Sequence, residues 1–197
     1  NNNGNPGDPD EDDPTPITFI ENPVIGVAKS ASPSSDNGNG TFTTTITLLI
    51  ENLGNVVLSN IQLSDDLVAT FPVPATFSIS NLTSPTLTID NNFNGNNNTL
   101  LLTGADTLAV AATASVSFDV TFNPNGLPGP FNNQAIANGQ GSGGAGTTDN
   151  SDEGTDPDSN NNNNPGDPDE EDPTIISFIE NPVIGVARKQ VTIPAVL

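Results

Sequence analysis

One loop of this chain carries oxygen-bearing side chains at the spacing found in calcium-binding loops. Counted from Asp156, carboxylates or amides occupy loop positions 1, 3, 5, 9 and 12, which are Asp156, Asp158, Asn160, Asn164 and Asp167. A short loop with oxygens at these positions can wrap a hard cation, and Ca²⁺ takes roughly six to eight such ligands. The spacing predicts a calcium site to which Asn162 and Asp169 also contribute.

Part of the same pattern stands near the start of the sequence. Asp8 matches loop position 12 and Asp10 corresponds to Asp169, whereas positions 1 and 3 would precede residue 1. We therefore expect Asp8 and Asp10 to belong to a second, incomplete site. The loop resembles EF-hand-like and thrombospondin-type calcium loops, with Asn161 in place of the turn glycine and Asp167 in place of the EF-hand glutamate. The alternative is a solvated acidic spacer that self-repulsion keeps extended.

The two acidic segments belong to an internal repeat. Residues 5–28, NPGDPDEDDPTPITFIENPVIGVA, recur at 164–187 as NPGDPDEEDPTIISFIENPVIGVA, and Pro6 returns as Pro165, an offset of 159 residues. This offset is far longer than the period of solenoids built from small repeats. We expect one complete unit and the opening of the next, cut from a longer array.

Composition excludes several classes of function. Asp and Glu number 24 against three basic residues, for a formal charge of −21, so contacts to nucleic acid phosphates are disfavoured. An anionic membrane surface is disfavoured for the same reason. No apolar run is long enough to insert into a membrane, and any export signal or anchor is expected outside this sequence. The absence of cysteine excludes disulfides and thiolate metal sites.

The central segment alternates apolar and polar residues with a period of two. Phe42, Ile46, Leu48 and Ile50 alternate with threonines, and residues 115–122 repeat the pattern. Shorter alternations occur near residues 61, 77, 87 and 100, and turns rich in Asn and Gly separate them. No segment has a helical period. The sequence therefore predicts an all-β fold, an antiparallel β-sandwich, with a core of Phe42, Ile46, Leu48, Ile61, Val116, Phe118 and Val120.

Three segments resemble a known family. Residues 43–66, TTTITLLIENLGNVVLSNIQLSDD, residues 108–122, LAVAATASVSFDVTF, and residues 131–139, FNNQAIANG, are similar to an Ig-like tandem repeat of very long Bacteroidota cell-surface adhesins, including gliding-motility adhesins. Ala111 and Ala112 replace the glycine-bearing turn usual in that family. The resemblance implies an Ig-like β-sandwich at the cell surface, with little indication of chemistry. Asp106-Thr107-Leu108 is similar to O-glycosylation sites of Bacteroidota.

Few residues are available for catalysis. The chain has no His, Cys, Tyr or Trp, and no serine lies in a nucleophile elbow. Asp65 and Asp66 form a pair that caps a turn or contributes to a cation site, because no third group separates their pKa values for acid–base work. Residues 141–146, GSGGAG, lack the helix and lysine of a phosphate loop and are expected to be a hinge. We predict that the protein is not an enzyme.

The predicted domains are an acidic connector at 1–13, an Ig-like sandwich at 14–140, a connector with the calcium loop at 141–173 and the first strand region of the next repeat at 174–197. The predicted function is that of a structural repeat in an extracellular adhesin or filament, whose calcium-stiffened joints space a distal region from the cell. Phe19 and Phe178 are either contacts at these joints or ordinary core. Expected partners are neighbouring repeats, parallel copies of the chain, and a distal ligand on a cell or substratum. A carbohydrate-binding module is the alternative, although Phe is the only aromatic residue that could stack on a sugar.

Overall fold

The computed structural model of this protein describes residues 15–182 and 184. In this part of the chain eleven strands and one four-residue helix follow one another. They are β1 (Ile25–Ala31), β2 (Ser35–Asp36), β3 (Phe42–Asn52), β4 (Ser59–Asp65), α1 (Leu67–Thr70), β5 (Thr76–Thr83), β6 (Thr113–Asn123), β7 (Phe131–Asn133), β8 (Ala135–Gln140), β9 (Gly146–Asn150), β10 (Asp152–Glu153) and β11 (Thr174–Ile176). The prediction of an all-β sandwich is confirmed.

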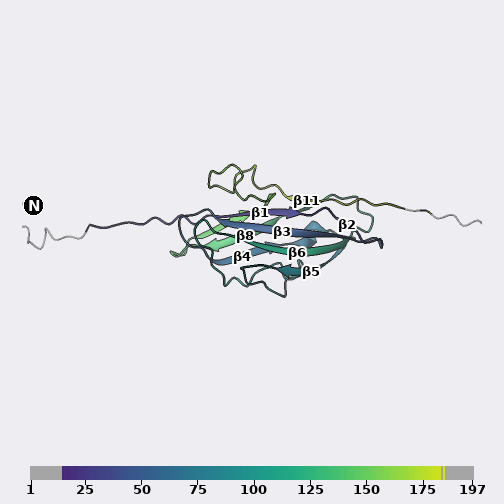
Figure 1. The fold of residues 1–197 in the computed structure, drawn as a ribbon, viewed down its shortest axis with the longest axis horizontal. Coiled ribbons are helices and arrows are strands. Elements are labelled where there is room, and N and C mark those ends of the chain that lie inside the picture. Colours follow the sequence, from purple (N-terminus) through teal and green to yellow (C-terminus); the bar gives the residue numbers. More distant parts are fainter. Residues whose placement is uncertain (1–14, 183, 185–197) are drawn as a thin grey trace, which may run out of the picture.

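The strands form one large sheet and two smaller ones. The large sheet has the order β10-β1-β3-β6-β5, with β2 paired to one end of β3. A second sheet has the order β4-β8-β9, and β11 pairs with β7 in a third. All pairs are antiparallel except β1 with β10. In Figure 1 the labelled strands run roughly along the long axis of the molecule.

The core lies between the large sheet and the β4-β8-β9 sheet. Alternate residues of β3 and β6 point inward, and their neighbours form the outer face. All seven residues predicted to form the core are buried. On the outer face the Thr45 hydroxyl donates to Asp119 and the Thr43 hydroxyl pairs with Thr121, so the threonine row is a polar cross-strand ladder.

Two of the shorter alternations do not form strands. The segments around Leu87 and Leu100 contribute isolated bridges, one of them between Ile89 and Leu102. They form a long irregular crossing between β5 and β6, because the Asn-rich turn at 91–98 bonds to itself. At the corner before β6, Ala111 has a φ of 56°. This left-handed conformation explains why glycine suits the position.

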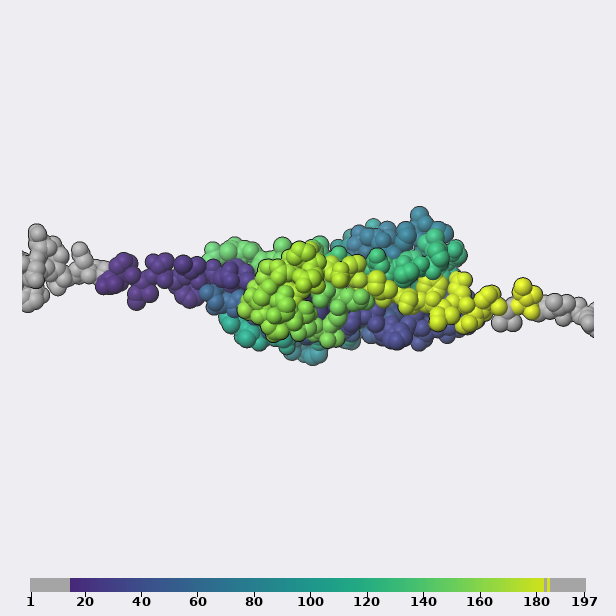
Figure 2. Space-filling model, turned by 90° about the horizontal axis from the view of Figure 1, so that it is seen from above, coloured from purple at the N-terminus to yellow at the C-terminus, as the bar shows by residue number. Residues whose placement is uncertain are grey.

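The sandwich extends past the boundary expected at residue 140. Strand β9 pairs along its length with β8, and the glycine-rich residues 141–146 form the tight turn between them, in place of the expected hinge. Strand β10 then adds to the edge of β1, and β11 adds to β7. Within the predicted connector, residues 154–173 lack strands, and the space-filling view shows this part lying on the side of the sandwich (Figure 2).

Candidate functional site

The segment 154–173, called the acidic loop below, leaves and re-enters the sandwich at one place. The carbonyl oxygen of Lys29 accepts a hydrogen bond from the amide of Gly154 and another from the hydroxyl of Thr174, each 2.9 Å long. The amide of Ile175 also donates to the carboxylate of Glu153, at 3.1 Å. The two ends of the acidic loop are therefore fastened side by side on β1.

The acidic loop covers the outer face of β1. A Cβ atom added to Gly26 would lie 2.9 Å from Cβ of Pro157 and 3.2 Å from Cβ of Pro165. Because the two prolines approach so closely, only glycine fits at this position. Strand β1 is consequently buried on both faces, by the core on one side and by the acidic loop on the other.

Most of the predicted calcium ligands lie within this loop and bond to one another. Asp158 is buried, and its two carboxylate oxygens accept from the amides of Asn162, at 3.1 Å, and Asn163, at 2.9 Å. The side-chain oxygen of Asn160 also accepts from the amide of Asn162. Asp167 accepts from the side-chain amides of Asn162 and Asn164. The structure thus brings five of the predicted ligands, Asp158, Asn160, Asn162, Asn164 and Asp167, into one folded turn.

The other predicted ligands are placed differently. Asp156 is exposed and accepts from the amide of Asp158, and Asp169 is exposed. Asp8 and Asp10 lie outside the described residues. Asn161 has a φ of 59°, as expected for its place in the loop. Among the described residues, no group of three or more acidic, His or Cys side chains is arranged to hold a metal ion. The hydrogen bonds of the loop account for its shape, and calcium binding stays a prediction.

Two buried carboxylates fix the backbone in and next to the acidic loop: Glu170 joins two parts of the loop itself, and Asp149 of β9 bonds to β1 beneath it. Glu170 accepts from the hydroxyl of Ser159 and the amide of Asn160, each at 3.0 Å. Asp149 accepts from the amide of Val27 at 2.7 Å. Burial raises the pKa of Asp149 to about 7, and the nearby carboxylates of Glu170 and Glu171 add to this rise. Sequence patterns gave no signal for these roles, because acidic residues surround both positions.

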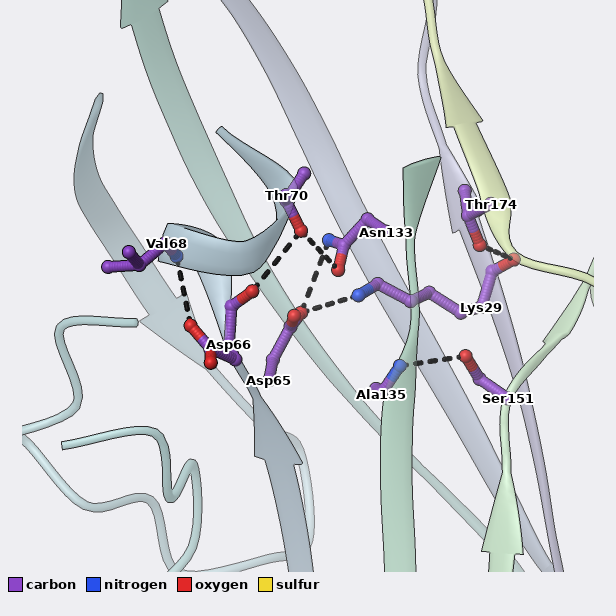
Figure 3. A network of polar contacts seen from close by, with 9 residues as sticks. All are labelled: Lys29, Asp65, Asp66, Val68, Thr70, Asn133, Ala135, Ser151 and Thr174. Carbon is purple, nitrogen blue, oxygen red and sulfur yellow. Dashed lines mark hydrogen bonds and ion pairs between the residues drawn. The ribbon is translucent and has the colours of Figure 1, made fainter. Parts of the chain in front are cut away.

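A second polar cluster lies inside the sandwich and joins three strands. Lys29 of β1 is fully buried, and its amine Nζ lies 2.5 Å from Oδ2 of Asp65 at the end of β4. The same Oδ2 accepts from the side-chain amide of Asn133 of β7 at 3.4 Å. Figure 3 shows the three side chains converging from different strands.

Thr70 completes this cluster, called the Lys-Asp-Asn cluster below. Its hydroxyl lies 3.1 Å from the amide oxygen Oδ1 of Asn133 and points toward it. Oδ1 of Asp65 is buried without a hydrogen-bond partner. Asp66 caps α1 through the amides of Val68 and Ala69. The turn-capping prediction therefore holds for Asp66, whereas Asp65 turns inward to Lys29.

Two asparagines at strand ends bond to backbone groups of neighbouring segments. Asn52 is buried, and its side-chain amide donates to the carbonyls of Val56 and Leu108. Asn55 donates to the carbonyl of Ile20 and accepts from the amide of Asn22. These side chains satisfy backbone groups that no strand partner reaches.

The opening of the second repeat copy packs into the sandwich of the first unit. Ile176 is 1% exposed, and Phe178 packs its ring against those of Phe42, Phe122 and Phe131 at centroid distances of 4.9, 5.6 and 5.8 Å. Phe178 therefore belongs to an aromatic cluster of the core at the end of the unit.

The matching residues of the first copy are exposed to solvent at the opposite end of the unit. Ile17 is 95% exposed and Phe19 is 68% exposed. From Ile20 onward the chain contacts the sandwich, because Asn55 holds Ile20 and Asn22, and the carboxylate of Glu21 accepts from Ser142 and from the amide of Gly143. One copy of the repeated segment is docked and the other is not.

Comparisons with known proteins identify no family. No protein-family model matches the chain, and no curated protein matches it. A solved structure of the inactive D437A mutant of a GH20 exo-β-N-acetylglucosaminidase from Vibrio harveyi aligns with a TM-score of 0.34 and 14% identity. The alignment covers 68% of this chain and 18% of that one. A similarity this low carries no conclusion about fold family or activity. Among the described residues, no helix is both long and apolar enough to cross a bilayer.

Proposed function

We propose that this chain is a structural, non-enzymatic repeat of a long extracellular surface adhesin or filament, in which Ig-like sandwiches follow one another and space a distal binding region from the cell. The observation that carries the proposal is the position of residues 174–178. These residues belong to the second copy of the repeated segment, yet they complete the sandwich of the first unit.

Within the docking segment, residues 15–19 of the first copy differ from residues 174–178 of the second only at exposed positions. The inward-facing residues Thr174, Ile176 and Phe178 have the same types as Thr15, Ile17 and Phe19. The exposed positions 175 and 177 vary, with Pro16 and Thr18 in the first copy. Proline has no backbone donor, and the amide of Ile175 donates to a side chain, the carboxylate of Glu153. Residues 15–19 therefore carry what is needed to dock on a preceding unit of the same kind.

In such an array each unit spans residues 20–178 and its neighbours follow without a linker. Phe178 packs into one unit, and Ile179 corresponds to Ile20, whose carbonyl is bonded to Asn55 of its own unit. Adjacent residues along the chain thus belong to different units. A joint of one peptide bond allows little relative rotation, which suits a stiff spacer.

Within this proposal, calcium would bind to the acidic loop of each unit. The predicted ligands lie in the acidic loop, whose two ends are fastened together at Lys29 of its own unit. A bound cation would reduce the repulsion among the carboxylates and hold the acidic loop on β1. It would stiffen each unit at the base of β11 and leave the distance between units unchanged.

A tandem chain tests the proposal. Residues 1–178 followed by residues 20–197 reproduce the natural junction, because residues 20–28 and 179–187 are identical. We expect two folded units with a narrow distribution of distances between a label in each unit, measured by pulsed electron spin resonance. A matched chain with four Gly-Ser residues inserted after residue 178 should show a broad distribution. Equally broad distributions in both chains would contradict the stiff joint, and aggregation or unfolding of the tandem chain would contradict the array. Labelling intact source cells with an antibody to this unit tests the surface location, and staining only after lysis would refute it.

A further inference from the structure

The Lys-Asp-Asn cluster has the composition of a reactive site. A lysine in a β-sandwich core is costly, because removing an ammonium from water without full hydrogen bonding is unfavourable. Lys29 would carry three N–H donors as an ammonium, and among the described residues Nζ has one hydrogen-bond partner, Oδ2 of Asp65. An ordinary buried ion pair would leave both Lys29 and Asp65 incompletely bonded.

Four observations indicate that the amine of Lys29 and the amide of Asn133 are placed to react. Oδ2 of Asp65 contacts both the amine of Lys29, at 2.5 Å, and the amide nitrogen of Asn133, at 3.4 Å, so one carboxylate bridges the two groups. The Thr70 hydroxyl lies 3.1 Å from the side-chain oxygen of Asn133 and 3.3 Å from the carbonyl of Asp66, and it polarises the Asn133 amide when it donates to the nearer oxygen. The second oxygen of Asp65 is buried and unpartnered, and is free to hold a proton. Burial lowers the pKa of Lys29, which favours the neutral, nucleophilic amine.

We propose that Lys29 and Asn133 form an intramolecular isopeptide bond inside the sandwich, with Asp65 as the catalytic acid–base group and Thr70 as the donor to the oxyanion. This inference does not depend on the proposed function. The bond would join β1 to β7, and thereby link the large sheet to the small sheet that holds β11.

The reaction balances without any added reagent. Lys29 passes a proton to Asp65, and its neutral amine attacks Cγ of Asn133, forming the Nζ–Cγ bond. The oxyanion of the tetrahedral intermediate at Cγ faces the Thr70 hydroxyl. Asp65 returns a proton to Nδ2, the Cγ–Nδ2 bond breaks and ammonia leaves. The second amine proton goes to Asp65, which ends protonated, so the starting ammonium and carboxylate become a neutral amide and a neutral acid. No group is oxidised or reduced.

Intact mass of the purified 197-residue chain tests the bond directly. Loss of ammonia lowers the mass by about 17 Da relative to the sequence. The Asn133→Ala and Lys29→Met variants should have their full sequence masses. Asp65→Asn keeps the volume of the side chain, so we expect it to fold with the same circular dichroism and to remain unlinked. A wild-type chain at full mass would overturn the proposal. A loss of about 18 Da, as water, would overturn Asn133 as the acceptor and assign the bond to Asp65.

Trypsin supplies an independent readout, because Lys29, Arg188 and Lys189 are the only basic residues of the chain. Trypsin does not cleave after a lysine whose amine is acylated. After denaturation the wild-type chain should therefore be cut only near residues 188 and 189, whereas Asn133→Ala should also be cut after residue 29. Cleavage of the denatured wild-type chain after Lys29, at the rate seen in Asn133→Ala, would refute the bond.

Discussion

Ile176 is buried in the aromatic end of the sandwich, whereas Ile17, the same residue 159 positions earlier, is almost fully exposed. The two side chains provide a matched pair of sites in one molecule, with identical chemistry and opposite environments. If the same substitution is made at each position, the difference in the free energy of unfolding measures how much the docking of β11 contributes to stability.

Replacing Ile176 by Asp should destabilise the chain strongly, because an unpaired carboxylate would enter the core and β11 would detach from β7. We expect a loss of about 3–5 kcal/mol in the free energy of unfolding, measured by urea denaturation. The control is Ile17→Asp, which should change this free energy by less than about 0.5 kcal/mol. Equal effects at both positions would mean that β11 does not dock in solution.

Gly129 should not tolerate a side chain. Its φ is 59°, and an added Cβ would lie 2.7 Å from Cε1 of Phe178. We expect Gly129→Ala to cost about 1–3 kcal/mol, part from the left-handed backbone and part from the displaced ring. In a Phe178→Ala background the second part should vanish, so the two substitutions should be less than additive in denaturation measurements. Strict additivity would show that the ring and Gly129 do not touch.

The sequence was informative where a pattern repeats along a strand. The alternation in β3 and β6 identified the core, and all seven residues predicted for it are buried. The Lys-Asp-Asn cluster was missed because its members lie on three strands far apart in the sequence. Lys29 did give a local signal, since it is the single basic residue of the unit and follows four small or apolar residues in its strand.

The extent of the unit was also misjudged from the sequence. Composition changes at residue 140, and the acidic residues that follow are typical of a solvated connector. Such a pattern does not reveal that Ser151, Asp158 and Glu170 are buried, because burial here depends on backbone amides and on the prolines that cover β1. The docking of β11 could not be predicted from its own residues, because it depends on the edge of β7 and on the aromatic rings that surround Phe178.

Stability should fall as pH rises from about 4 to about 7. The pKa of Asp149 in the folded chain is about 7, above its ordinary value of 3.8. The folded state therefore holds a proton that the unfolded state releases, and stability is lost as pH rises through the folded pKa. Asp149→Asn keeps an acceptor for the amide of Val27 without the charge. It should raise stability at pH 8 by on the order of 1–2 kcal/mol and flatten this part of the pH profile. An unchanged profile would contradict the assignment to Asp149.

Calcium should raise the melting temperature if the acidic loop binds it. A free concentration about 100 times the dissociation constant stabilises by about 2.7 kcal/mol, and chelator should remove the effect. Asp167→Asn should abolish it, because an amide is a weaker ligand than a carboxylate. Asp36→Asn, on the exposed strand β2, is the control and should respond like the wild-type chain. A melting temperature that is the same with calcium and with chelator would leave the loop as an acidic cover for β1.

The carbonyl of Lys29 accepts hydrogen bonds from both ends of the acidic loop. These roughly twenty residues therefore add nothing to the length of the unit, because they start and finish at the same point on β1. Their number could change between units without altering the spacing along the array or the direction in which the next unit leaves. The acidic loop is therefore a position at which units of an array could differ in sequence, in charge or in the ligand they bind, while every neighbouring unit keeps its position.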